Sequence, residues 1–268
     1  MPYIDTHTHI YLEQFNQDRA AVVDRAKNAQ VSHLLMPNID SHTAVFMMKA
    51  ARDFPDTCLP MMGLHPTSIK ATWKTELEMI EGWFNKYDFV AVGETGMDLY
   101  WDQTYEAEQK ESFARHIAWA AAFKLPLVIH SRNSLNEIFD VLEAHSNLAL
   151  TGVFHCFPGT PEQAAKVLDM GFMLGIGGVV TYKNSLMADV VSSVGMEHII
   201  LETDAPFLSP FPHRGKRNES AFLPYIAEKI AALKGLDVED VAQVTTTNAS
   251  RLFGLKVGGF AAFESYRR

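Results

Sequence analysis

Cysteine is scarce in this chain, with Cys58 and Cys156 as the two thiols among 268 residues. Two thiols cannot form the disulfide framework that stabilises small secreted domains, and a chain of this length can bury a core without one. The sequence also lacks an apolar run of the roughly 18 residues that a membrane span needs, and its first residues lack a basic and then apolar leader. These absences favour a soluble, cytoplasmic protein that does not bind membranes.

A positive charge balance is also absent, because the formal net charge is −9. This value argues against a protein that coats nucleic acid nonspecifically, although it leaves room for a local basic surface that binds phosphates. There are no biased tracts and no long linkers rich in proline, glycine and serine. A composition of 47% hydrophobic and 21% charged residues is typical of one globular unit.

Eight short apolar runs alternate with amphipathic stretches along the chain. The runs are YIDTH, VSHLLMP, CLPMMGLH, FVAVGE, LPLVIH, LTGVFH, FMLGIG and HIILETD. Between them, segments 16–30, 104–124 and 224–236 repeat apolar residues at steps of three and four and are predicted helices, and Gly235 is placed to end the last one. The alternation predicts an α/β protein, a (β/α)8 TIM barrel over residues 1–255, with an appended tail of unknown order at 256–268. The alternative is an open doubly wound sheet, but no glycine-rich phosphate-binding sequence follows the first run.

Ionisable side chains that can bind metals close six of the eight runs. They are His7, His9, His65, Glu94, His130, His155 and Asp204. Catalytic residues of such barrels lie where the strands end, and imidazoles and carboxylates that converge there can hold a divalent cation. Because alternate residues of a strand face the same side, we expect His7 and His9 to bind one ion while Asp5 orients their rings.

A single buried histidine is more often a packed core residue than a ligand, so the placement of the whole set carries this prediction. Five other histidines fall at no strand end and are expected to be structural or surface residues: His33, His42, His116, His145 and His198. Cys156 follows His155 directly, which suggests a Cys/His nucleophile. Since neighbours on a strand face opposite sides, we expect Cys156 to be a small packing residue instead.

Seven motifs occur in the order DTHTH, GLHP, GETGMDL, VIHSR, FHCFPG, LETDAPFLSP and PHRGKRNE. With them, the chain resembles the TatD-related metal-dependent hydrolases, a deoxyribonuclease-like family of the amidohydrolase superfamily, from about Asp5 to Leu255. The resemblance implies two divalent metal ions, the first held by His7, His9, Glu94 and Asp204. It implies that Glu94 bridges to a second ion held with His130 and His155, and that His65 and Arg132 lie beside the substrate phosphate. The tail after Leu255 has no counterpart in the family pattern.

Two cations in such a site would lower the pKa of a shared water and make it the nucleophile. The ligands are nitrogen and oxygen without thiolate, so magnesium, manganese and zinc all remain candidates. Asp204 could take the proton of the water in addition to binding metal, or could serve as a ligand alone. His65 could donate a hydrogen bond to a nonbridging phosphate oxygen, or could pack beneath the following turn. We therefore predict catalytic roles for Asp204, Glu94 and His65.

Basic residues gather in the segment PHRGKRNE, where Arg214, Lys216 and Arg217 lie within four positions. A basic loop of this kind suits a polyanion, because arginine can bind phosphate with two hydrogen bonds and lysine adds a point charge. The alternative is a solvated loop tied to Glu219 and neighbouring acids. Three aromatic residues that follow strand ends, Tyr100, Trp101 and Phe157, could stack on bases or cap the barrel.

The sequence thus predicts a deoxyribonuclease that cleaves DNA phosphodiester bonds near a strand end and works as a monomer. An ester or amide hydrolase, such as an aminoacyl-tRNA deacylase, is the alternative enzyme, because the same activated water attacks a carbonyl carbon. A metal-bound scaffold without turnover is a third hypothesis, and the complete set of predicted ligands argues against it. The sequence leaves open the choice between DNA and RNA and the direction of attack.

Overall fold

Parallel strands and helices alternate along the computed structural model, which describes residues 2–255. The strands in this range are β1 (Tyr3–Asp5), β2 (Val31–Pro37), β3 (Cys58–Met61), β4 (Val92–Asp98), β5 (Leu127–Arg132), β6 (Gly152–Phe154), β7 (Phe172–Ile176) and β8 (Ile199–Leu201). Each strand overlaps one of the apolar runs in the sequence, so the predicted series of strands is confirmed. The predicted tail, residues 256–268, lies outside the described residues.

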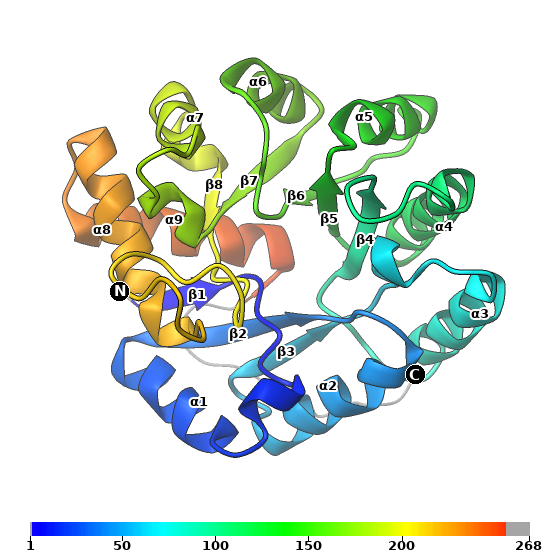
Figure 1. The fold of residues 1–268 in the computed structure, drawn as a ribbon, viewed down its shortest axis with the longest axis horizontal. Helices are drawn as coiled ribbons and strands as arrows, with labels where there is room; N and C mark the ends of the chain where they lie inside the picture. The colour runs from blue at the N-terminus through cyan, green and yellow to red at the C-terminus, as the bar shows by residue number, and fades with distance from the viewer. Residues whose placement is uncertain (1, 256–268) are drawn as a thin grey trace.

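All the helices except the last form a ring around the strands (Figure 1). The helices in the described range are α1 (Arg19–Asn28), α2 (Ser41–Asp53), α3 (Trp73–Phe84), α4 (Glu106–Phe123), α5 (Leu135–Ala144), α6 (Pro161–Asp169), α7 (Met187–Ser193), α8 (Leu223–Lys234) and α9 (Val238–Phe253). Short 3₁₀ helices occupy Glu13–Phe15, Pro66–Ser68, Gly178–Thr181, Met196–His198 and Ser220–Phe222. Gly235 ends α8 with φ of 66°, as the sequence predicts, because glycine adopts this left-handed conformation without strain. None of the described helices is long and apolar enough to cross a membrane.

Backbone hydrogen bonds divide the strands into a three-stranded sheet, β1–β2–β3, and a five-stranded sheet in the order β4 to β8. Two isolated bridges join the sheets: Thr8 with Ala205 at the β1/β8 seam, and Met62 with Val92 at the β3/β4 seam. At the β1/β8 seam, Asp204 N donates to His7 O at 2.9 Å and His9 N donates to Ala205 O at 2.7 Å. The strands thus close into the predicted TIM barrel, with an isolated bridge at each seam in place of a continuous ladder.

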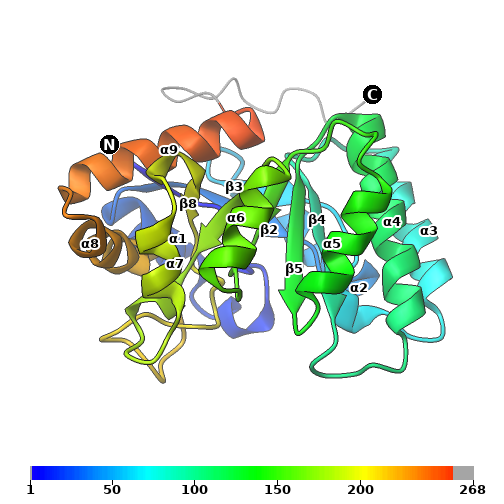
Figure 2. The same ribbon diagram turned by 90° about the horizontal axis from the view of Figure 1, so that it is seen from above.

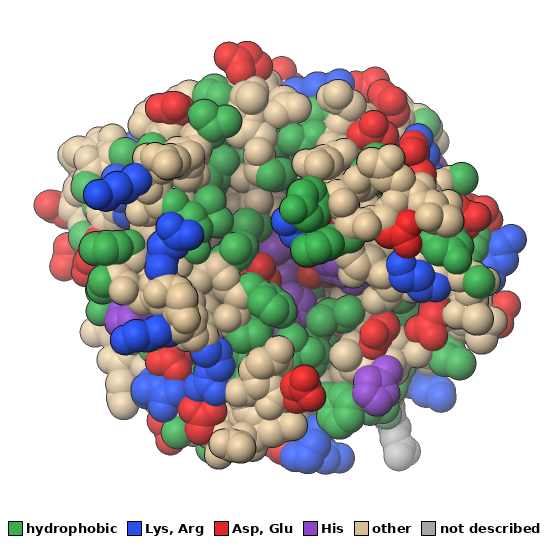
Figure 3. All heavy atoms as spheres, in the orientation of Figure 1, with side chains coloured by type: hydrophobic (Ala, Val, Ile, Leu, Met, Phe, Trp, Pro, Cys, Tyr) green, Lys and Arg blue, Asp and Glu red, His purple; other side chains and the backbone are tan. Residues whose placement is uncertain are grey.

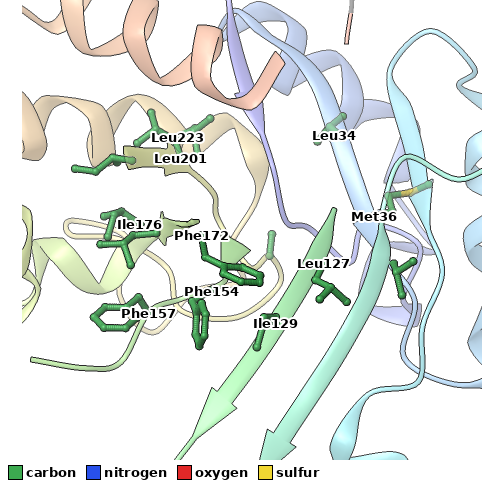
Figure 4. Close-up of a cluster of buried hydrophobic side chains, with 14 of the residues drawn as sticks. Leu34, Met36, Leu127, Ile129, Phe154, Phe157, Phe172, Ile176, Leu201 and Leu223 are labelled. Atoms are coloured by element: carbon green, nitrogen blue, oxygen red, sulfur yellow. The ribbon is translucent and has the colours of Figure 1, made fainter. Parts of the chain in front are cut away.

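The core has two layers, because successive residues of each strand face opposite sides. On β5, Leu127 and Ile129 face the surrounding helices, where Figure 4 shows them among other buried apolar side chains. Val128 lies between them in sequence and belongs to the inner cluster, which fills the barrel.

Helix α9 covers the end of the barrel where the strands begin, opposite the arrowheads in Figure 2. Ala249 and Phe253 of this helix pack against the inner cluster. Thr246 Oγ1 donates to Pro2 O at 2.9 Å, and Asn248 Nδ2 donates to Ile199 O at 2.9 Å. One end of the barrel is therefore sealed, and the loops that follow the strands surround the other end, which we call the mouth.

Candidate metal centre

The mouth of the barrel is hollowed, and histidine side chains lie at the bottom of the hollow (Figure 3). Their ring nitrogens and the neighbouring carboxylates form three overlapping groups that could hold a metal ion. Together these groups contain all seven of the residues predicted from the strand ends: His7, His9, His65, Glu94, His130, His155 and Asp204. The structure thus brings the whole set together, and its role in metal binding stays a prediction.

Glu94 lies at the centre of the cluster and is 1% exposed. Strand β4 continues past it to Asp98, so Glu94 is an interior residue of the strand rather than its last one. Its Oε1 lies 3.0 Å from His130 Nδ1 and 3.2 Å from His155 Nε2. Its Oε2 lies 3.2 Å from His7 Nε2. One carboxylate oxygen thus faces each of the two ligand sets that the family resemblance implies, as a bridging residue requires.

The first ligand set has the spacing that a small cation needs. His7 Nε2 lies 3.3 Å from His9 Nε2, 3.2 Å from Glu94 Oε2 and 3.7 Å from Asp204 Oδ1. His9 Nε2 lies 3.6 Å and 3.5 Å from the same two oxygens. Ligand atoms about 2.1 Å from a tetrahedral ion lie about 3.4 Å from one another, so His7, His9 and Glu94 have the spacing that a divalent metal needs, and Asp204 lies at a similar distance from both imidazoles.

The charge of the cluster also fits cations. Four carboxylates contact its imidazoles: Glu94, Asp98, Glu202 and Asp204. Burial lowers the pKa of His155, but the charges of Glu94 and Glu202 outweigh burial and hold that pKa well above its usual value. The site thus takes up positive charge readily, and two divalent ions would balance the formal charge of −4 on its four carboxylates.

His9 and His65 each have a hydrogen-bond partner two residues further along the chain, and these partners place the ring hydrogen on different nitrogens in the two histidines. Tyr11 Oη donates to Pro37 O at 2.5 Å, so its oxygen accepts the hydrogen of His9 Nδ1, 3.0 Å away. The Nε2 of a neutral His9 therefore carries a lone pair toward Glu94, as a metal ligand must. In contrast, His65 Nδ1 accepts from the backbone N–H of Thr67 at 3.1 Å, so its Nε2 carries the hydrogen. The Nε2–H of His65 faces Glu94 Oε1 at 3.3 Å, and the predicted contact of His65 to substrate stays a prediction.

Two carboxylates that sequence reasoning missed support the ligand rings. Asp98 Oδ2 lies 2.9 Å from His130 Nε2, and Glu202 Oε1 lies 3.2 Å from His155 Nδ1. Each carboxylate can take the ring N–H that faces it and direct the other ring nitrogen toward Glu94, which is how proteins commonly orient metal-binding histidines. Alternation along β4 offers a signal for Asp98, which lies four residues after Glu94, but Glu202 lies beyond the end of β8, where alternation does not apply.

The role predicted for Asp5 is wrong. Its carboxylate accepts hydrogen bonds from Thr203 N at 2.9 Å and from Thr203 Oγ1 at 2.6 Å. It does not contact the rings of His7 and His9, which it was predicted to orient. Strand β1 ends at Asp5, so strict alternation does not extend to the histidines. Burial raises the pKa of Asp5 to about 7. Asp5 therefore fastens the end of β1 to the segment that carries Asp204, and positions the ligands through the backbone.

Cys156 does not turn away from the site as predicted, because β6 ends at Phe154 and Cys156 adopts φ of 42°. It lines the same cleft as His155. Burial raises the pKa of its thiol to about 12, so the thiol stays protonated and is not a nucleophile. His116 is structural, as predicted: its Nε2 accepts from Leu64 N at 2.9 Å, and its Nδ1 donates to Ser112 O at 2.7 Å.

The predicted phosphate-binding residues have different surroundings. The Arg132 guanidinium lies 4.0 Å from the centre of the Tyr100 ring, and that of Arg214 lies 4.0 Å from the centre of the Tyr182 ring. Both arginines are exposed at the mouth, as is Lys216. Phe157, in contrast, is 1% exposed and belongs to the core (Figure 4), so its ring is not free to stack on a base from solvent.

Arg217 has a partner within the protein and is not left for phosphate. Its Nη1 and Nη2 donate to the two carboxylate oxygens of Asp18 at 2.8 and 2.7 Å, and Nη1 also donates to Gln14 O at 2.7 Å. Arg25 pairs in turn with Glu219 at 2.7 Å. The basic loop is therefore tied at Arg217 to the loop before α1, much as the alternative interpretation of this segment expects.

The barrel and its cluster are those of a metal-dependent hydrolase, and comparisons with known proteins agree. A family described as TatD related DNase matches residues 4–254. The chain therefore belongs to the TatD-related DNase family.

Individual relatives span nearly the whole chain. A Bacillus subtilis (strain 168) protein named uncharacterized metal-dependent hydrolase YabD is 36% identical over 250 residues, which cover 93% of this chain and 98% of that protein. A Pantoea ananatis (strain LMG 20103) protein named 3′-5′ ssDNA/RNA exonuclease TatD is 32% identical over 258 residues, covering 94% and 99%. The crystal structure of YJJV, a TatD homologue from Escherichia coli K12, has a TM-score of 0.88 at 26% identity and covers 95% of this chain and 98% of that one.

Proposed function

We propose that this chain is a divalent-metal-dependent deoxyribonuclease that hydrolyses phosphodiester bonds at the end of a single strand. The observation that carries the proposal is the composition of the mouth. Its loops expose apolar side chains, and two exposed arginines, Arg132 and Arg214, lie against aromatic rings there. The exposed apolar side chains of these loops are Tyr100, Trp101, Leu186, Phe207, Leu208 and Phe211. Unpaired bases stack on such side chains while cationic groups follow the phosphates.

The shape of the mouth supports a substrate of nucleotide size. A cleft of about 420 Å³ is lined by His130, Arg132, His155 and Asp204. A second cleft of about 650 Å³ shares Val179 and Ser185 with the first and extends to Arg214. Both volumes fall within the range of roughly 300–1,000 Å³ that is usual for ligand sites. A strand that enters with one end could thus run from the metal centre toward Arg214.

The side chains of the centre have distinct tasks in the proposed reaction. Divalent ions, when bound, neutralise phosphate charge and lower the pKa of water. Burial raises the pKa of the Asp204 carboxyl, but the contact with His9 and the positive charges that His155 and His7 can carry outweigh burial, and the net pKa lies below its usual value. Asp204 is therefore ionised at neutral pH and able to accept a proton. The Nε2–H of His65 can donate to a nonbridging phosphate oxygen.

The name of the Pantoea ananatis relative supports a single-stranded substrate and attack from the 3′ end. The test uses protein purified without chelator, metal analysis, and 5′-labelled single-stranded DNA with added magnesium, manganese or zinc. We expect a ladder of products shortened from one end, which disappears when metal is removed and returns when it is restored.

Two parallel substrates test the alternatives. Faster cleavage of RNA of the same sequence would contradict the preference for DNA, and release of amino acid from aminoacyl-tRNA without DNA cleavage would identify an ester hydrolase. Absence of turnover with bound metal on all three substrates would identify a metal-bound scaffold. Any of these three results would overturn the proposed deoxyribonuclease.

A further inference from the structure

Two adjacent aromatic side chains at the mouth are exposed although they lie next to the metal centre. Trp101 is 67% exposed and Tyr100 is 53% exposed, whereas Trp73 and Trp119 are 7% and 4% exposed. The two rings meet edge to face with centroids 4.9 Å apart, and the Arg132 guanidinium lies 4.0 Å from the Tyr100 ring and 5.0 Å from the Trp101 ring. We call Tyr100, Trp101 and Arg132 the aromatic platform.

The aromatic platform is fixed to the metal centre through Asp98. Asp98 Oδ2 lies 2.9 Å from His130 Nε2, and its Oδ1 accepts from the backbone N–H groups of Tyr100 at 3.1 Å and Trp101 at 3.2 Å. Asp98 is also the register partner of Arg132 across β4 and β5. One buried carboxylate thus sets both a ring of the metal centre and the backbone of the platform, so the distance between them is fixed before substrate binds.

A small cleft with apolar walls lies beside the platform. Its volume is about 220 Å³, and Trp101, Tyr105, Ile69 and Pro66 contribute to its lining. The ion pair of Lys70 with Asp102, 2.9 Å long, also borders it. Flat apolar walls next to exposed indole suit a planar heterocycle, because a ring that enters the cleft leaves water and stacks at the same time.

Arg132 lies against the two rings but leaves more than half of each side chain exposed to solvent, so a ligand can still reach them. A guanidinium held flat over an aromatic ring keeps its in-plane N–H groups free for a phosphate. Arg132 also lines the 420 Å³ cleft beside His130 and His155. The platform therefore borders both clefts, with Arg132 beside His130 and His155 in one and Trp101 in the other.

We propose that the aromatic platform and its cleft bind the base of a nucleotide that adjoins the scissile phosphate, with the base against Trp101 and the phosphate on Arg132. This inference rests on the proposed nuclease function and specifies its substrate: the enzyme requires a base, and not the sugar–phosphate chain alone, next to the bond that it cleaves. Recognition by stacking accepts any of the four bases.

The test is a thermodynamic cycle in which the indole is removed from the protein, the base is removed from the substrate, or both are removed. Substrates are single-stranded DNAs in which a tetrahydrofuran residue replaces the base of one of the two nucleotides flanking the scissile bond. The parent, Trp101→Ala and Trp101→Phe are compared by kcat/KM on each substrate. Phe46→Ala is the matched control, since Phe46 is an exposed aromatic residue on α2, 46% exposed, away from the mouth.

In the parent, we expect loss of the base at one of the two positions to reduce kcat/KM by about 5- to 100-fold, the usual worth of base stacking on an aromatic side chain. Trp101→Ala should lose a similar factor on the complete DNA and should then be indifferent to base removal at that position. Trp101→Phe should retain part of the discrimination, and Phe46→Ala should behave as the parent. The metal content and the midpoint of thermal unfolding should change little in any variant.

Independent effects of Trp101→Ala and base removal at both positions would overturn the base-binding role. A lower metal content or a lower unfolding midpoint in Trp101→Ala, together with an equal loss of kcat/KM on the complete and on both base-free DNAs, would also overturn it, because that result would identify a structural defect of the loop. Failure of the parent to cleave any DNA would instead refute the proposed function, so the two failures are distinguishable.

Discussion

The three basic residues of the loop after β8 should contribute unequally to DNA cleavage, although the sequence treats them alike. Arg214 and Lys216 are exposed, and the Arg214 guanidinium lies on Tyr182. Arg217 is held by two hydrogen bonds to Asp18 at 2.8 and 2.7 Å. Arg214→Ala and Lys216→Ala should therefore each remove one phosphate contact, whereas Arg217→Ala should remove none.

The size of the effect follows from counterion release. Each phosphate contact on a single strand contributes about 0.7 to the slope of log K against log salt concentration. The double variant of Arg214 and Lys216 should thus flatten the slope by about 1.4, and Arg217→Ala should leave it unchanged. Loss of the Asp18 pair, which is partly exposed and screened by water, should cost about 0.2–1 kcal/mol of stability.

The assay measures kcat/KM for a single-stranded oligonucleotide between about 50 and 200 mM KCl. The same salt series with a small chromogenic phosphodiester corrects for effects on the metal centre itself, and thermal unfolding of Arg217→Ala measures its loss of stability. If Arg217→Ala flattened the slope as much as Arg214→Ala, the assignment of Arg217 to Asp18 would be refuted. Unchanged slopes in all variants would show that the loop does not contact phosphate.

Three further substitutions test the centre and the fold. Glu94→Gln should lower both metal content and turnover while the circular dichroism spectrum is kept; two bound metals with full activity would rule out a bridging role. Asp204→Asn should reduce kcat by about 10²- to 10⁴-fold with metal binding only weakened, and a near-normal rate at neutral pH would exclude Asp204 as the base. Burial lowers the pKa of His116 to about 4, so the unfolded chain, with a pKa near 6.5, binds the proton first and stability is lost as pH falls from about 6.5 to 4. At about pH 5 this loss is about 2 kcal/mol of unfolding free energy. His116→Gln removes the titrating group, so the substitution should destabilise the protein by about 2 kcal/mol less at about pH 5 than at neutral pH, as measured by urea unfolding. An equal destabilisation at both pH values would contradict the assigned pKa.

Much of the barrel could be predicted from the sequence because its signal is local. Each strand overlaps a short apolar run, and Gly235 ends its helix where the sequence places it. The end of a strand is less predictable: β4 runs on to Asp98 because the segment from Val92 to Asp98 is buried throughout. The prediction therefore placed Glu94 correctly on the inner face of the barrel but wrongly at the end of its strand, because β4 ends four residues later, at Asp98.

The contacts that sequence reasoning missed join residues far apart in the chain. Asp18 and Arg217 are separated by 199 positions, and Asp5 and Thr203 by 198. Local patterns cannot reveal such pairs, because the register of the strands and the closure of the barrel bring them together. Asp98 differs, since alternation along β4 already places it on the same face as Glu94.

The two seams of the barrel have a consequence for how the protein would hold its ions. His7 and His9 follow the three-stranded sheet, whereas Glu94 and His130 belong to the five-stranded sheet. An ion shared by His7, His9 and Glu94 would join the two sheets, because its ligands come from both. Separation of the two sheets and loss of the ion would then be coupled, so bound metal would stabilise the closed barrel.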